Sequence, residues 1–222
     1  MPIAVTYLLD PLCGWCYGAA PVIGQLAQQA SIQLDLLPTG LFVGGDRTMD
    51  AAFAEYAWSN DQRIAQRTGQ SFTEAYRQQV LGRTGSPFDS AAATLALTAA
   101  SLTAPQREMS TLRMLQQARY VQGLDICDAA VVASLLREQG LDAAADLLAS
   151  GNAGLQAANI VRIEKALSLM ERLGAQGVPH LVVHSAQGDR LLGGSALYGD
   201  LETLLHQIEE AAGRDACMQA SH

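Results

Sequence analysis

The chain has 222 residues, of which 49% are hydrophobic and 16% charged, so it is long enough for a sizeable core and globular in composition. Its formal net charge of −8 disfavours nucleic acid and anionic lipid as partners, because phosphate groups repel an acidic surface. The apolar runs are shorter than the ~20 residues that a transmembrane helix needs, so no membrane association is expected. Four cysteines are too few for a disulfide scaffold in a chain of this length.

A buried strand is predicted first, from Ile3 to Leu9, where a short apolar run contains β-branched and aromatic residues. This N-terminal segment has neither a basic region nor a small-residue cleavage site, so it does not resemble a secretory signal. If Met1 is the native start, we expect a cytoplasmic protein. A helix from about 13 to 29 follows, and then a strand over 32–37 that ends at Pro38 and Gly40.

The middle of the chain, from about residue 50 to residue 173, has helical signals almost throughout. Separate helices are predicted over 91–101, 108–120, 128–139 and 142–149. A long amphipathic helix follows, and its apolar residues are Ile160, Ile163, Leu167 and Met170. Gly151, Gly154 and Gly174 are interpreted as breaks around this helix.

Strands return after Pro179, over 181–183 and 190–193, and a turn at 186–189 joins them as a hairpin. A final helix runs from about Leu201 to Gly213 and precedes a polar tail. Without the helical middle, a β-α-β unit and a β-β-α unit remain, which predicts a small mixed α/β sheet with helices on both faces. The expected organisation is a sheet domain of 1–38 and 176–213, a helical insertion of 39–175, and a flexible tail of 214–222.

The chemistry is concentrated in Cys13-Gly14-Trp15-Cys16, where the first strand ends and a helix begins. The free N–H groups and positive dipole end of a helix stabilise a thiolate, most strongly at the first cysteine. Cys13 is therefore the predicted attacking thiol, and Cys16, one turn into the helix, the resolving thiol that releases the product. Gly14 and Trp15 are expected to tune the redox potential and to contact the substrate.

A zinc half-site is the main alternative for the cysteine pair, but the sequence has no second pair of ligands at suitable spacing. His180 and His184 are four residues apart in a predicted strand, where such residues lie ~13 Å apart. No metal and no other cofactor are therefore expected.

The segment Asp10-Pro11-Leu12-Cys13-Gly14-Trp15-Cys16-Tyr17-Gly18 resembles the active site of DsbA-type thioredoxin-fold proteins. It is most similar to the cytosolic FrnE-like branch of predicted protein-disulfide isomerases. The segments 40–45, 120–126 and 177–179 also resemble that branch, so the similarity covers nearly the whole chain.

This resemblance implies a thioredoxin fold with a helical insertion between its two halves. It also implies that Pro179 is cis and packs against the cysteine pair, and that the backbone of Val178 binds substrate. Phe42, between Leu41 and Val43, is a candidate for the apolar lip of a cleft near Cys13.

The residues between the cysteines differ from those of the strongly oxidising relatives, which usually have Pro-His where this chain has Gly-Trp. A reductase or isomerase is therefore favoured, with protein or peptide disulfides as substrates and a thioredoxin- or glutathione-type reductant. Two alternatives stay open. One is a glutathione-dependent transferase or isomerase of the kappa-class and hydroxychromene carboxylate isomerase type, and the other is a non-catalytic binding module.

The remaining candidates have structural interpretations. Cys127 is interpreted as a half-buried residue and Cys217 as an incidental thiol of the tail. Asp10 is interpreted as a strand-end turn residue rather than a proton acceptor for Cys16. The helical spacing of Phe53, Tyr56 and Trp58 favours core positions over the lining of a cleft.

Overall fold

A four-stranded mixed sheet of order β2-β1-β3-β4 forms the centre of the computed structural model, which describes residues 1–213. The strands are β1 (Ile3–Leu9), β2 (Ile32–Pro38), β3 (His180–Ser185) and β4 (Gly188–Gly193). The pair β1–β2 is parallel because helix α1 (Gly14–Leu26) crosses between the two strands, whereas β1–β3 and β3–β4 are antiparallel. The β1–β3 pairing brings together segments that are far apart in the sequence.

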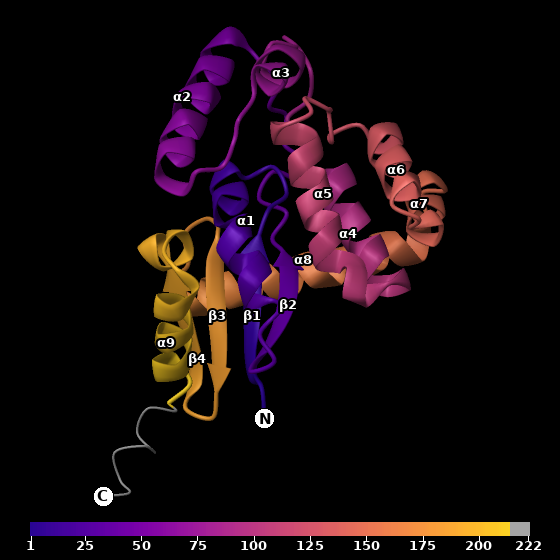
Figure 1. Ribbon diagram of the computed structural model, residues 1–222. Coiled ribbons are helices and arrows are strands. Elements are labelled where there is room, and N and C mark those ends of the chain that lie inside the picture. The colour runs from indigo at the N-terminus through magenta and orange to yellow at the C-terminus, as the bar shows by residue number, and fades with distance from the viewer. Residues whose placement is uncertain (214–222) are drawn as a thin grey trace, which may run out of the picture.

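The side chains of β1 alternate between the two faces of the sheet. Both faces are therefore apolar, and helices cover each of them. Tyr7 and Leu9 share one apolar cluster with α1 and α9 (Leu201–Ala211). Leu8 points to the other face, where it packs in a cluster with Ala166 and Leu169 of α8 (Ala153–Leu173). Figure 1 shows α8 crossing behind the strands.

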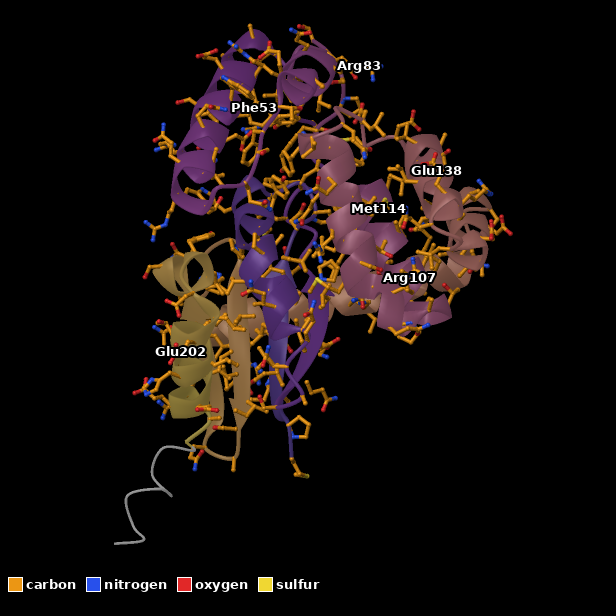
Figure 2. The ribbon with its side chains drawn as sticks, viewed as in Figure 1. Phe53, Arg83, Arg107, Met114, Glu138 and Glu202 are labelled. Atoms are coloured by element: carbon orange, nitrogen blue, oxygen red, sulfur yellow. The ribbon has the colours of Figure 1, made fainter. Side chains whose placement is uncertain are left out.

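The other helices form a block beside the sheet and beyond the carboxyl ends of β1 and β2, where α1 begins (Figure 1). They are α2 (Ala51–Thr68), α3 (Glu74–Tyr76) with the π-helical turn Arg77–Leu81, α4 (Ala91–Thr103), α5 (Glu108–Tyr120), α6 (Ala129–Glu138) and α7 (Asp142–Ala149). Short 3₁₀ turns cover Pro105–Arg107 and Gly194–Tyr198. In Figure 2, Phe53 of α2 and Glu202 of α9 mark opposite parts of the molecule.

Arg162 of α8 connects the sheet to the helical block. Its guanidinium donates to the carbonyl of Leu36 on β2 at 2.6 Å and to the hydroxyl of Thr98 on α4 at 3.2 Å. It also pairs with the carboxylate of Glu108 on α5. Because this network is half-buried and charge-assisted, it fixes α4 and α5 relative to α8 and the sheet edge.

Two glycines allow α2 to lie directly on α1. A Cβ at Gly14 would lie 2.6 Å from Oδ1 of Asp61, and one at Gly18 would lie 2.8 Å from Cγ2 of Ile64. The glycines are four residues apart and therefore share one face of α1. Helix α2 of the block therefore packs closely against the first two turns of α1.

The expected α/β fold with its helical insertion is confirmed, and the predicted bounds of β1, α5 and α7 agree with the structure. The assignment of Gly154 as a break is wrong: α8 begins at Ala153, and Asn152 caps it by accepting from the N–H of Leu155 at 3.0 Å. Helix α1 ends at Leu26, short of the predicted residue 29. The domain boundaries stay predictions, and the tail 214–222 with Cys217 lies outside the described residues.

None of the helices in residues 1–213 combines the length and the apolar character required to cross a membrane.

Candidate active site

The two cysteines of the motif occupy different environments at the start of α1. Cys13 is the N-cap residue of the helix and keeps 8% of its surface exposed, whereas Cys16, in the first turn, is fully buried. Both are free thiols. The turn after β1 positions Cys13, whose N–H donates to the carbonyl of Asp10 at 3.1 Å. Of the two thiols of the motif, Cys13 is the one accessible to another molecule.

Burial raises the pKa of Cys16 well above its ordinary value. A hydrogen bond and charge interaction with the Cys13 thiol raise it further. Cys16 is therefore held as a neutral thiol, while Cys13 lies at the positive end of the α1 dipole. This asymmetry is the one expected for an attacking and a resolving thiol.

The loop that precedes β3 contacts the thiol of Cys13. The peptide bond Val178–Pro179 is cis, as the family resemblance implied. The thiol of Cys13 donates to the carbonyl oxygen of Val178 over 3.6 Å. The ladder between β1 and β3 explains this proximity, since it pairs Leu8 with His180, the residue after the proline.

Asp10 is a buried carboxyl group beneath the motif. It accepts hydrogen bonds from the N–H of Leu12 at 2.9 Å, from the N–H of Phe42 at 3.2 Å and from the hydroxyl of Ser90 at 2.8 Å. Burial raises its pKa, and these hydrogen bonds oppose that shift. The interpretation of Asp10 as a strand-end turn residue is confirmed, and the residue also anchors two loops of the helical block.

A cavity of about 270 Å³ opens beside Cys13, between the start of α1 and the helical block. Gly14, Arg47, Asn60 and Asp61 line it with seven aromatic side chains: Trp15, Phe42, Phe53, Tyr56, Tyr76, Phe88 and Tyr120. Three of the predicted substrate-binding residues, namely Gly14, Trp15 and Phe42, therefore lie in its wall. Trp15 also packs on Tyr198, with 5.1 Å between the ring centroids.

The far wall of the cavity holds polar residues that the sequence did not reveal as site residues. The hydroxyl of Tyr120 donates to the carbonyl of Leu12 at 2.8 Å and so supports the turn before Cys13. The hydroxyl of Tyr76 donates to Oδ2 of Asp61 at 2.9 Å. Behind these rings, the guanidinium of Arg119 is fully buried, 5.6 Å from the ring of Tyr76 and 5.8 Å from that of Tyr120.

Asp61 is the acidic group of this wall, with 4% of its surface exposed. Burial raises its pKa from 3.8 to about 7, against the opposing effects of the Tyr76 hydrogen bond and the Arg119 charge. One sequence signal could have identified it. Phe53, Ala57 and Ile64 form an apolar stripe on α2, and Asp61 interrupts that stripe at helical spacing.

The aromatic residues of α2 agree only in part with the sequence interpretation, since Phe53 and Trp58 are half-buried and pack against a core cluster. Phe53 and Tyr56 line the cavity, and Tyr56 is 66% exposed rather than a core residue. Trp58 faces elsewhere, with the guanidinium of Arg77 5.0 Å above its ring. Cys127 is half-buried, as predicted, and burial raises its pKa.

Comparisons with known proteins agree with this geometry. The model of the DSBA-like thioredoxin domain family matches residues 4–208. A comparison with curated proteins found no match.

Several solved structures share the fold. The cytosolic disulfide reductase DsbM from Pseudomonas aeruginosa is 30% identical, with a TM-score of 0.81 over 94% of this chain and 100% of that one. The same protein with GSH gives a TM-score of 0.79 at 30% identity, over 93% and 98% of the two chains. A protein from Nitrosomonas europaea, provisionally assigned as a protein disulfide isomerase, has a TM-score of 0.77 at 22% identity, over the full length of both chains. This last likeness concerns the fold alone.

Proposed function

Because the chain belongs to the DSBA-like thioredoxin domain family and is a protein-disulfide oxidoreductase, we propose that it reduces or isomerises disulfides through Cys13 and Cys16. One observation carries the assignment of roles. The accessible thiol, Cys13, lies at the N-terminus of α1 against the cis-proline loop, while the buried thiol, Cys16, lies one turn behind it.

In the first step, the thiolate of Cys13 attacks one sulfur of the substrate disulfide. A mixed disulfide forms, the substrate S–S bond breaks, and the departing sulfur leaves as a thiolate that takes up a proton. An extended substrate beside Cys13 would place its backbone along the loop at Val178, and Pro179 holds that loop against the motif. The substrate enters through the cavity lined by Gly14, Trp15 and Phe42.

In the second step, Cys16 attacks Cys13 in the mixed disulfide. The Cys13–Cys16 disulfide forms, the second substrate thiol is released, and the proton of Cys16 passes to that departing sulfur. Because Cys16 is held as a buried neutral thiol, it does not compete for the substrate during the first step. Two electrons have then moved from the cysteine pair to the substrate.

A thiol reductant must restore the dithiol, and a glutathione-type molecule is the proposed donor. Two such thiols would reduce the Cys13–Cys16 disulfide and leave as one oxidised disulfide. The relative that carries GSH and is described as a cytosolic reductase supports this direction of electron flow and a cytoplasmic location. A thioredoxin-type donor would satisfy the same balance of electrons.

The roles of the two thiols can be tested by trapping the intermediate. We expect Cys13→Ser to abolish reduction of a protein disulfide, and Cys16→Ser to accumulate a mixed disulfide on Cys13. Intact-protein mass spectrometry with peptide mapping locates the adduct, and Cys127→Ser is the matched control because that thiol lies outside the motif. Stable adducts on Cys16 of the Cys13→Ser variant, with none on Cys13 of the Cys16→Ser variant, would reverse the assignment.

A further inference from the structure

The cavity beside Cys13 is unusually aromatic for this chain. The protein has only four Phe, two Trp and six Tyr residues, and seven of these aromatic residues line this one cavity. A wall for general apolar contact would be made mainly from the Leu, Val and Ala that dominate the composition. The concentration of aromatic faces indicates a more specific ligand, because their negative π-surfaces attract cations.

The lining of the cavity contains one acidic side chain, Asp61, and one basic side chain, Arg47 at the rim. Asp61 is 4% exposed and accepts one hydrogen bond, from Tyr76 to Oδ2. Within residues 1–213 it has no ion-pair partner, although a buried carboxylate is costly unless a cation neutralises it. Burial raises the pKa of Asp61, and the charge of the buried Arg119 opposes that rise only in part.

The position of Asp61 relates this charge to the reacting sulfur. Its Oδ1 lies 2.6 Å from the point that a Cβ of Gly14 would occupy, and Gly14 directly follows Cys13. A group that binds Asp61 would therefore lie within a few bonds of a sulfur that binds Cys13. The two side chains come from different elements, α1 and α2, so a ligand that touches both spans the cavity.

Arg47 provides an internal example of a cation bound by this wall. Its guanidinium lies 4.7 Å from the ring centroid of Phe53 at the rim of the cavity. Arg47 is exposed and has no ion-pair partner in the part of the chain that the structure describes. Deeper in the cavity, the rings of Tyr76, Phe88 and Tyr120 lie 5.6 Å, 5.6 Å and 5.8 Å from the buried guanidinium of Arg119, and Asp61 lies among them.

We propose that the cavity binds a primary ammonium group through Asp61 and the surrounding aromatic rings, and thereby selects disulfides that carry an amine a few bonds from the sulfur. This inference rests on the proposed function, since it gives Cys13 the exchange chemistry described above. Asp61 acts here as a substrate-binding residue. The ammonium group pairs with its carboxylate before the thiolate of Cys13 attacks the disulfide.

Three small disulfides of similar size but different charge separate the effect of the ammonium group from that of the disulfide itself. Cystamine carries two ammonium groups, bis(2-hydroxyethyl) disulfide is neutral, and 3,3′-dithiodipropionate is anionic. The rate at which reduced protein forms a mixed disulfide on Cys13 would be measured for each and divided by the rate with 2-mercaptoethanol, to remove intrinsic reactivity. We expect cystamine to be preferred over the neutral disulfide by about ten-fold, the size of one desolvated ion pair or cation–π contact.

Asp61→Asn should remove most of this preference, measured as the ratio of the normalised cystamine rate to the normalised rate with the neutral disulfide. Asparagine keeps a carbonyl oxygen for Tyr76 and alters only the charge. The matched control is Glu55→Gln, which makes the same change of charge at an exposed position of the same helix. It should leave all three rates unchanged.

The unmutated protein provides a second measurement that does not depend on the folding of a variant. Propylammonium should slow its reaction with cystamine, and propanol at the same concentration should not. Equal rates for all three disulfides, or an equal fall for all three in Asp61→Asn, would overturn the proposal and leave the proposed function intact. Failure of Cys13 to react with any disulfide would instead contradict the proposed function.

Discussion

The two walls that enclose Cys13 are built in different ways. The wall from the sheet domain presents backbone: the carbonyl of Val178 faces the thiol, and the turn from Asp10 to Cys13 holds the motif by main-chain hydrogen bonds. The wall from the helical block presents side chains, chiefly Asp61, Tyr76 and the aromatic rings around them. Backbone contacts accept many substrates, whereas side chains distinguish among them.

This difference suggests how the molecule divides its tasks. The sheet domain holds the two thiols and the cis-proline loop, and the block contributes most of the side chains that line the cavity beside Cys13. Insertions on a rigid scaffold commonly carry specificity in this way. We propose that the helical block, about residues 39 to 175, sets substrate choice without altering the basic reactivity of Cys13.

The largest effect is expected from the buried charge of the block. The pKa of Asp61 is raised from 3.8 to about 7, so the folded protein loses stability as the pH rises through that range. A shift of this size corresponds to about 4 kcal/mol at most. Asp61→Asn should therefore become progressively more stable than the unmutated protein between about pH 4.5 and pH 8.

Urea unfolding at several pH values measures this difference directly. Other titrating groups are common to both proteins and cancel in the comparison, and Glu55→Gln serves as the control because Glu55 is exposed. Tyr76 and Arg119 face Asp61, and neither changes its charge in this interval. If the stability difference were the same at every pH, Asp61 would be ionised throughout, and the block wall would be permanently charged.

An intermediate effect is expected where the two walls meet. Gly14→Ala places a methyl group 2.6 Å from Oδ1 of Asp61 and 3.0 Å from Cδ1 of Ile64, so the Asp61 side chain, α2 or both must shift. Such overpacking costs about 1–3 kcal/mol. The backbone at Gly14 is helical, so the loss would come from the neighbouring helix and not from backbone strain.

Gly24→Ala on the same helix provides the matched control. A methyl group there meets only Nη1 of Arg113, at 3.8 Å, so the usual preference of helices for alanine should dominate. That preference is worth about 0.5–1 kcal/mol. Thermal or urea unfolding should show opposite signs for the two variants, and two stabilised variants would mean that α2 yields easily at its contact with the motif.

The sheet wall could be predicted from the sequence largely because its determinants are local. The apolar run before Cys13, the change to helical spacing after it, and the cysteine motif specify β1, α1 and the thiols. The cis bond before Pro179 came from the family resemblance, since local preference alone favours trans. The position of Val178 beside Cys13 follows once β3 pairs with β1.

The block wall could not be predicted, because its site residues depend on how separate helices pack. Asp61 reaches the cavity only because Gly14 and Gly18 let α2 lie against α1. Tyr120 reaches Leu12 across 108 residues of sequence. Phe53 fits the pattern of a core residue equally well, since an apolar stripe that lines a cavity has the same spacing as one that packs.

The smallest effect is expected at Phe42, on the loop between the two walls. Its side chain lines the cavity and contacts the edge of Phe88, with 4.9 Å between the ring centroids, and its neighbours Leu41 and Val43 are 46% and 38% exposed. The N–H of Phe42 donates to Asp10, so the backbone of the loop should keep its position when the side chain is shortened.

Phe42→Ala should therefore weaken reduction of an unfolded protein disulfide by roughly five-fold, equivalent to about 1 kcal/mol of contact with the substrate. The reaction of Cys13 with a small aromatic disulfide should stay nearly unchanged, because that reagent does not need the lip of the cavity. Leu102→Ala is the control: it removes a 56% exposed apolar side chain on α4, away from the cavity lining. If the rates of both reactions fell together in Phe42→Ala, the loop would affect the reactivity of the Cys13 thiol itself. Phe42 would then not act on substrate selection alone.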